Sequence, residues 1–353
     1  MRVPKPKTFG EAIDVFLHHS EHVAGVEETT LRGYRVTAGM LAAEEFPRET
    51  PVRSVTAERI DAYQTRLLTT PVGRGRREPR PLRRKTVRNR MLVLSGILQR
   101  ARALGWIGAN PVSEIRIVPD PGANPDFNVF SPKQVEMVAA AITVIPDREL
   151  PMMRNGLVDE RSVAVMRACR TIWSEAVRLA AYTGLRFGEL RDLRWRDVDW
   201  HGRNLHVRRN TPTSAPAGVR SKRPKGRRAR SLPLIDQAVD VLRRLERAGV
   251  PTGPNDLVLP NTAGGILDAG KVRGGFYATL ARAGLGYMRE KENPITLHDL
   301  RHTFGTLGVR TAPVTDMQEY LGHAQIQTTM RYVHFRPRND AAKRLSEAFA
   351  SEG

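Results

Sequence analysis

The sequence has a single cysteine, Cys169, among 353 residues. No disulfide can form within the chain, which excludes a disulfide-stapled secreted scaffold. The sequence also lacks a run of about 18 apolar residues, and its first residues have no apolar core of the signal-peptide kind. We therefore expect no membrane segment and a cytoplasmic location. Acidic residues are few as well, because 37 Asp and Glu stand against 57 Lys and Arg, a formal net charge of +20.

This positive charge favours a polyanionic partner. Arginine supplies 48 of the 57 cations, and its planar guanidinium binds phosphate through two hydrogen bonds. A charge this far from zero costs self-repulsion, which nucleic acid would relieve. A membrane surface fits less well, because no strongly basic amphipathic helix with an aromatic apolar face is present. The apolar fraction of 40% suffices for a core, and the length suggests about two domains.

Residues 1–110 predict a helical domain. Thr8 and Glu11 form a capping-box pattern before an apolar stripe, which indicates a helix start. Further helices are expected after Thr29-Thr30 and after Thr56, and a fourth that ends at Gly105. We expect the fourth to bury a stripe that consists of Val87, Met91, Leu94, Leu98 and Ala101.

Residues 111–128 hold four prolines and one glycine, which is typical of an interdomain linker. A second domain, 129–353, is expected to begin at Ser131-Pro132 with a helix that runs to Tyr182 and a turn at Gly184. Three short strands are expected near 198–200, 205–208 and 231–234. The remaining expected helices are 236–248, 268–283, 296–309, 316–321 and 328–333. The predicted fold class is mainly α with a small antiparallel β-sheet.

Two segments are densely basic. Nine cations and one acid lie between Arg74 and Arg90, and seven cations without an acid lie between Arg220 and Arg230. For residues 74–80 the alternative to phosphate contact is a solvated, partly disordered loop. Cations at the start of a helix oppose its dipole, so those of the fourth helix predict phosphate contact. They are Arg83, Arg84, Lys85, Arg88 and Arg90. The second run is either a solvated loop or a finger on a phosphate backbone, with Lys222, Arg223, Arg227 and Arg228 as candidate contacts.

The segment Thr183 to Leu190 reads TGLRFGEL, a helix end, a tight turn and a new helix. Arg186 lies at this junction, where its side chain can point into a cleft. An arginine in such a turn is more often a surface residue or a carbonyl cap.

The segment Leu297 to Phe304 reads LHDLRHTF. His298 and Arg301 are three residues apart and share a helix face, so together they form an anion site that can transfer protons. His298 and His302 also have the spacing of a helical zinc pair. Zinc is disfavoured because Arg301 would place a cation beside the metal.

The segment Tyr320 to His334 reads YLGHAQIQTTMRYVH. His323 follows the end of a short helix, and Tyr332 comes nine residues later. A tyrosine in a helix usually packs in the core with its hydroxyl bonded. Here Met330 and Val333 can supply the apolar face, which would leave Tyr332 to point elsewhere.

Taken in order, these motifs resemble the tyrosine recombinases, the phage integrase family. The resemblance runs from about residue 8 to 345. It implies a helical core-binding domain followed by an α+β catalytic domain. It also implies that Arg186, Lys225, His298, Arg301, His323 and Tyr332 are catalytic, with Tyr332 as the nucleophile and Glu189 in a supporting role. Lys222 competes with Lys225 for the role of the hairpin lysine.

The resemblance implies a site-specific DNA recombinase that cuts and rejoins strands through a 3′-phosphotyrosyl linkage. The implied partners are double-stranded DNA, three further copies of the chain in a homo-tetramer on paired sites, and an accessory directionality protein. No cofactor, metal or membrane is implied, and the location would be nucleoid-associated. The helical pattern starts at Thr8, so we expect no separate arm-binding domain. The alternatives are a type IB topoisomerase-like enzyme and a DNA-binding protein without chemistry.

Overall fold

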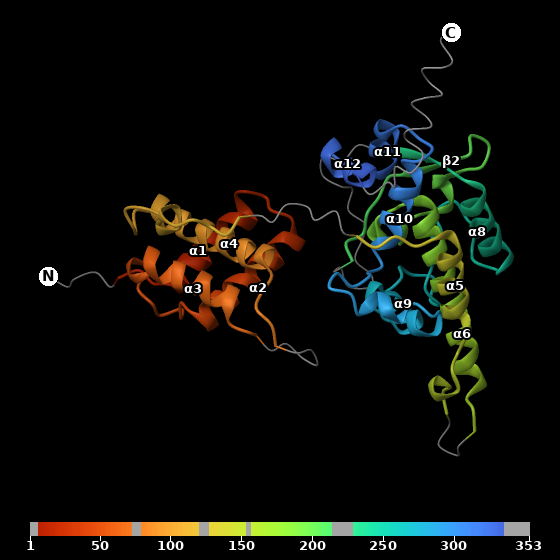
Figure 1. Ribbon diagram of the computed structural model, residues 1–353, viewed down its shortest axis with the longest axis horizontal. Coiled ribbons are helices and arrows are strands. Elements are labelled where there is room, and N and C mark those ends of the chain that lie inside the picture. Colours follow the sequence, from red (N-terminus) through yellow and green to blue (C-terminus); the bar gives the residue numbers. More distant parts are fainter. Residues whose placement is uncertain (1–5, 73–78, 120–126, 153–156, 214–228, 335–353) are drawn as a thin grey trace, which may run out of the picture. The chain divides into compact units, whose positions relative to one another are not determined.

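A computed structural model describes residues 6–72, 79–119, 127–152, 157–213 and 229–334 (Figure 1). The chain divides into two compact units, Met1–Asn124 and Pro125–Gly353. Over the described residues the first unit consists of helices, and the second adds a three-stranded sheet. No helix in these ranges is long and apolar enough to cross a membrane.

The first unit contains four α-helices that bury their apolar stripes against one another. Thr8 caps the first helix, because its hydroxyl accepts the Glu11 N–H at 3.2 Å while Glu11 accepts the Thr8 N–H at 2.8 Å. Thr56 caps the third helix through its hydroxyl alone, which accepts the Arg59 N–H at 3.3 Å. The second helix starts at Glu28, two residues earlier than Thr30. The elements are α1 (Phe9–His22), α2 (Glu28–Glu44), α3 (Ala57–Thr69), α4 (Arg84–Ala103), and the 3-10 turns η1 (Val52–Ser54) and η2 (Pro111–Glu114).

The proline-rich segment packs on both units at its described ends. Val112 and Val118 are buried in the core of the first unit, and the side chain of Gln64 accepts the Val118 N–H at 2.9 Å. Phe127 is buried in a small apolar cluster of the second unit. Residues 120–126 lie outside the described ranges, and the domain boundaries at 110 and 128 stay a prediction.

The second unit begins with two helices where the sequence predicted one. Ser131 caps α5 (Pro132–Thr143) with Gln134 as its capping-box partner. The helix then stops, and a new helix, α6 (Glu160–Thr183), begins after Asp159, which caps it. A continuous helix was the wrong prediction, because Pro146 and Pro151 in the intervening segment are incompatible with a helix interior. This segment contains the 3-10 turn η3 (Asp147–Glu149).

The sheet is antiparallel with strand order β1-β2-β3. Its strands are β1 (Val198–Asp199), β2 (Asn204–Val207) and β3 (Arg230–Pro233), each within two residues of the predicted bounds. Leu205 of β2 lies opposite Val198 on one side and Leu232 on the other. All three side chains are buried. The sheet thus contributes one apolar face to the core.

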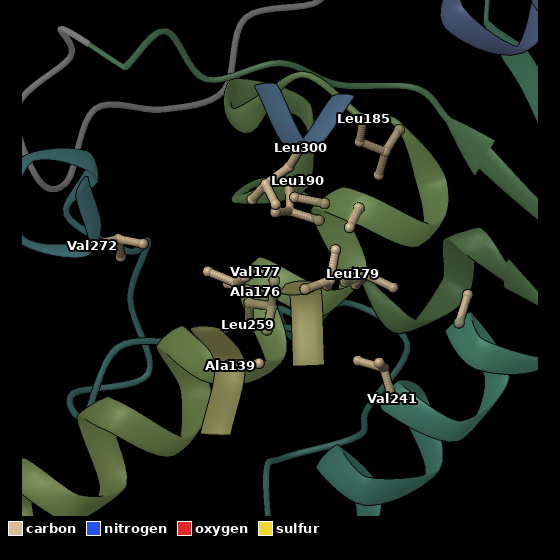
Figure 2. Close-up of a cluster of buried hydrophobic side chains, with 14 of the residues drawn as sticks. Ala139, Ala176, Val177, Leu179, Leu185, Leu190, Val241, Leu259, Val272 and Leu300 are labelled. Carbon is tan, nitrogen blue, oxygen red and sulfur yellow. The ribbon is translucent and has the colours of Figure 1, made fainter. Parts of the chain in front are cut away.

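The main core of the second unit surrounds α6. Figure 2 shows Ala176, Val177 and Leu179 of this helix among apolar side chains from several other elements. The short helices α11 and α12 lie next to α10 (Figure 1). The remaining elements are α7 (Phe187–Leu190), η4 (Trp195–Asp197), α8 (Asp236–Arg247), α9 (Ala269–Arg282), η5 (Gly286–Arg289), α10 (Asp299–Gly308), α11 (Val314–Leu321) and α12 (Ile326–His334).

Gly184 ends α6 in the left-handed region, with φ = 61°. A Cβ added there would lie 2.4 Å from Cδ1 of Phe304. We therefore expect Gly184→Ala to lower the free energy of unfolding by about 1–2 kcal/mol for the backbone conformation and by a further ~1–3 kcal/mol for overpacking.

Gly249→Ala is the matched control, because Gly249 has φ = 75° and nothing within 4 Å of an added Cβ. It should lose only the backbone part. Urea unfolding of both variants measures the difference. Equal losses would contradict the steric argument.

Candidate active site

Arg186 lies at the N-terminus of α7, directly after the Gly184 turn. Its backbone N–H donates to Glu189 Oε2 at 3.0 Å, and its Nη1 donates to Glu189 Oε1 at 3.1 Å. Its Nη2 donates to the Gly322 carbonyl at 3.0 Å. The guanidinium therefore connects the start of α7 with the end of α11. The sequence offered a surface residue or a carbonyl cap as alternatives; the side chain is only 25% exposed, and its bond to Gly322 does cap the carbonyl end of α11.

Arg301 is the central cation of the second unit. It is 2% exposed and donates from Nη1 to the Gly184 carbonyl at 2.7 Å and from Nη2 to the Leu321 carbonyl. Burial, with the charge of Arg186 nearby, lowers its pKa to about 9. The guanidinium therefore remains charged at neutral pH.

Three histidines surround these arginines, and the protein lowers the pKa of each. The loss of hydration is the main cause, and it brings the pKa of His298 to about 4, of His302 to about 4 and of His323 to about 3. The nearby arginines act in the same direction. His298 is exposed at the cavity edge while the other two are half-buried, so solvent screens His298 most. At neutral pH these imidazoles are uncharged and can accept protons.

Tyr332 is buried, with 2% of its surface exposed. It packs with Phe127, Met317 and Leu321, and its hydroxyl lies 3.0 Å from Nδ1 of His302. Burial raises its pKa above the ordinary value of 10.0. The sequence predicted that Met330 and Val333 would form the apolar face of this helix and leave Tyr332 to point elsewhere. This prediction was wrong, because the Tyr332 ring itself lies in the apolar cluster.

These side chains enclose one cavity of about 190 Å³. Five of the six residues predicted to be catalytic line it. The sequence considered His302 only as a zinc ligand and did not single out Thr328 or Arg331. The full lining is Arg186, His298, Arg301, His302, His323, Thr328, Arg331 and Tyr332. In the described part of the chain, no group of three or more His, Cys, Asp or Glu could hold a metal ion.

Arg230 supports the site from β3. Its guanidinium donates to both carboxylate oxygens of Glu189, at 3.0 and 2.7 Å, and its Nε donates to the Tyr320 carbonyl at 2.9 Å. Burial alone would raise the pKa of Glu189, but the hydrogen bonds and charge of Arg230 outweigh it and lower this pKa to about 2. The sequence predicted that Arg230 belongs to a basic loop that is either solvated or bound to a phosphate backbone. This was wrong, because Arg230 pairs with the buried carboxylate of Glu189.

The basic residues of α4 have different environments. Arg83, Arg84 and Lys85 are exposed, whereas Arg88 is half-buried and donates to the Val118 carbonyl at 3.4 Å. Arg90 is 3% exposed and donates to Glu44 at 2.5 Å and to the Tyr63 hydroxyl at 3.0 Å. The predicted phosphate contact at Arg90 is therefore wrong. An ion pair with Glu44, whose side chain is 33% exposed, occupies this buried guanidinium.

The basic loop between β2 and β3 falls largely outside the described residues, which omit 214–228. Nothing in the structure therefore places the candidates on this loop, and their roles stay predictions. They are Lys222, Arg223, Lys225, Arg227 and Arg228.

Comparisons with known proteins fit this geometry. Residues 158–338, about half of the chain, match the model of the phage integrase family. The chain belongs to this family, that of the tyrosine recombinases. A tyrosine recombinase XerC-like protein of Caldanaerobacter subterraneus subsp. tengcongensis is 26% identical over 269 residues, which cover 69% of this chain. The same match covers 61% of the relative, so this chain spans less than two thirds of that protein's length.

Solved structures show the fold. The Tn1549 transposon integrase in complex with transposon right end DNA has a TM-score of 0.68 and 19% identity, with 97% of this chain and 99% of that chain covered. A lambda integrase tetramer bound to a Holliday junction has a TM-score of 0.66 and 16% identity, with coverages of 93% and 78%. The predicted fold class, mainly α with a small antiparallel sheet of the tyrosine-recombinase type, is confirmed.

Removing Arg230 leaves Glu189 buried without its bidentate partner. We expect Arg230→Met to lower the free energy of unfolding by ~3 kcal/mol, the scale for breaking a buried ion pair by deleting one partner. The control is Arg203→Met, because the Arg203–Asp236 pair is 55% and 83% exposed and should change stability by less than about 1 kcal/mol. Chemical unfolding measures both, and equal losses would argue against a structural role for the Glu189 pair.

The lowered histidine pKa values predict acid sensitivity. Unfolded histidines take up protons below their ordinary pKa of 6.5, while folded His302 and His323 do so only near pH 4 and 3. The unfolded state thus binds more protons in this window, so stability is complete above pH 6.5 and falls as the pH drops towards 4. Glu189 adds its own loss only below its ordinary pKa of 4.5.

Differential scanning calorimetry between pH 7 and 4.5 measures this loss as a falling Tm. Replacement of both His302 and His323 by Asn should flatten the profile, while His201→Asn, which changes an exposed histidine, should leave it unchanged. A double variant that keeps the wild-type slope would contradict this origin.

Proposed function

We propose that this chain is a site-specific DNA recombinase. In this proposal Tyr332 attacks a DNA phosphodiester and holds the cut strand as a 3′-phosphotyrosyl linkage, and the 5′-hydroxyl of another strand reverses the step. The observation that carries it is the location of the Tyr332 hydroxyl in one small cavity with three arginines and three histidines. A cavity of this charge accepts an anion, and the tyrosine is its nucleophile.

Arg186 and Arg301 stabilise the charge that builds up at phosphorus. Displacement at a phosphodiester concentrates negative charge on the non-bridging oxygens, and guanidinium groups donate paired hydrogen bonds to such oxygens. Arg301 has five N–H donors and is held in place by two backbone carbonyls. Because those carbonyls fix the guanidinium before substrate arrives, little reorganisation is needed during the reaction. His298 and His323 supply further hydrogen bonds to the phosphate.

The departing 5′ oxygen needs a proton. Lys225 is our candidate for this general acid, with Lys222 as the alternative, and both belong to the loop for which the structure gives no description. The cleaved bond's energy is retained in the phosphotyrosyl linkage, so rejoining requires no nucleotide cofactor. Glu189 keeps Arg186 oriented through its two hydrogen bonds.

The proposed partners are double-stranded DNA and further copies of the chain. The net charge of +20 and the exposed cations Arg83, Arg84 and Lys85 at the start of α4 support a DNA contact, with Arg88 beside them. The solved relatives support the same partners, one an integrase in complex with DNA and the other a tetramer bound to a Holliday junction. We propose a homo-tetramer on paired sites, served by an accessory directionality protein.

Tyr332→Phe tests the nucleophile. The substitution removes only the hydroxyl and keeps the buried ring, so the fold and DNA binding should be unchanged while covalent adducts disappear. The substrate is a nicked duplex that carries a recombination site identified first by sequencing the DNA that flanks the coding gene, and denaturing gels measure the adduct. Phe16→Tyr, a change in the first unit, is the control and should leave adduct formation intact. Adducts that persist in Tyr332→Phe would overturn the assignment.

A supercoiled plasmid with two such sites distinguishes the alternatives. A recombinase produces deletion or inversion, a topoisomerase-like enzyme produces only relaxed circles, and a binding protein produces a gel shift without adducts. Either of the last two results would overturn the proposed function.

A further inference from the structure

His302 makes a direct contact with the proposed nucleophile that the sequence motifs did not assign. Its Nδ1 lies 3.0 Å from the Tyr332 hydroxyl, a normal hydrogen-bond distance. His298, the histidine that the sequence placed in the anion site for proton transfer, makes no hydrogen bond to this hydroxyl among the described residues. Its ring is edge-on to that of His302, with centroids 4.9 Å apart.

The orientation of the His302 ring is fixed by its neighbours. Phe127 stacks on it with centroids 4.7 Å apart and an interplanar angle of 27°. Phe127 is held in turn by the backbone that follows it, because the Asn128 N–H donates to Asp299 and the Phe130 N–H donates to Thr303, each at 3.0 Å. The imidazole is therefore anchored on α10 with Nδ1 directed at α12.

The Tyr332 ring is fixed as well. A Cβ on Gly305 would lie 2.6 Å from Cε2 of Tyr332, so only a glycine allows the ring to lie this close to α10. The ring also meets Phe127 edge-on at 5.3 Å. Two fixed rings thus hold one hydroxyl and one ring nitrogen at bonding distance, which is the geometry required for proton transfer.

We propose that His302 is the catalytic base that removes the phenolic proton of Tyr332 during DNA cleavage, a role that rests on the proposed function. The bond from Tyr332 Oη to phosphorus forms as the bond from phosphorus to the 5′ oxygen breaks. The phenolic proton moves to Nδ1 of His302, and the leaving oxygen takes a proton from the general acid. On religation the same histidine returns the proton to the tyrosine.

Several charged and titratable groups face His302. Arg301 comes from its own helix α10 and His298 from the residue before that helix, Arg331 and Tyr332 come from α12, Arg186 from the start of α7, and His323 from the turn before α12. Loss of hydration, together with the charges of Arg331 and Arg301, holds the pKa of His302 low. A bound phosphodiester adds a negative charge that opposes these cations. Substrate binding therefore strengthens the base at the step that needs it.

The test measures single-turnover adduct formation on the nicked substrate from pH 6 to 9. His302→Asn keeps a hydrogen-bond acceptor but cannot take a proton, so we expect cleavage to slow by ~100-fold at pH 7, the lower range for a lost general base. The rate of the variant should rise about tenfold per pH unit as solvent hydroxide replaces the base. DNA affinity and Tm should stay near wild type, which separates catalysis from folding.

Two variants serve as controls. His206→Asn removes a histidine whose Nδ1 also bonds a hydroxyl, that of Ser231 at 2.8 Å, but outside the cavity. It should cleave at the wild-type rate. His298→Asn should lose activity without the tenfold pH slope. If His298→Asn shows that slope and His302→Asn does not, the base is His298 and the proposal is overturned.

A measurement on the unsubstituted protein covers the case in which His302→Asn fails to fold. Nitrogen-15 shifts of labelled imidazoles report the tautomer, and the proposal requires that Nε2 of His302 carries the proton at pH 7 and Nδ1 does not. A protonated Nδ1 would overturn it. Wild-type protein that forms no adduct would defeat the proposed function, whereas wild-type cleavage with an equally fast His302→Asn would defeat this inference alone.

Discussion

The site depends on the convergence of two helix ends on two guanidinium groups. Helices α6 and α11 both end at a left-handed glycine, Gly184 with φ = 61° and Gly322 with φ = 60°. Arg301 donates to the carbonyls of Gly184 and Leu321, and Arg186 donates to that of Gly322. Because helix C-termini carry partial negative charge, they stabilise cations that burial would otherwise disfavour. The anion-binding charges are therefore part of the folded framework itself.

The concentration of positive charge has consequences for every titratable group in the cavity. Burial of Arg301 is tolerable only while its donors are satisfied, and its charge then helps to keep the neighbouring histidines neutral. Glu189 provides the opposite charge, and Arg230 together with Arg186 keeps it ionised. The result is a cavity with fixed cations and uncharged imidazoles. In a phosphodiester reaction such cations stabilise negative charge, whereas uncharged imidazoles accept protons.

Local sequence patterns predicted much of the fold. They did not predict contacts between residues that are far apart in the sequence. The caps at Thr8, Ser131 and Gly184 follow from short motifs, and the two strand pairs follow from a turn and alternating burial. The break between α5 and α6 was also visible as two prolines but was missed. The partners of Arg90, Arg230 and His302 lie 46, 41 and 30 residues away. Composition cannot distinguish a cation that binds phosphate from one that neutralises a buried carboxylate.

The residues that precede α5 illustrate why motif order alone describes only part of such a site. Phe127 belongs to a segment that reads as linker, yet its ring packs against both His302 and Tyr332. The backbone that follows it is bonded to α10. Since an imidazole transfers a proton only in a narrow range of orientations, the residues that restrict its ring contribute to the chemistry without touching substrate. The catalytic geometry therefore includes an aromatic side chain from outside the conspicuous motifs, and that side chain is selected by shape rather than by charge.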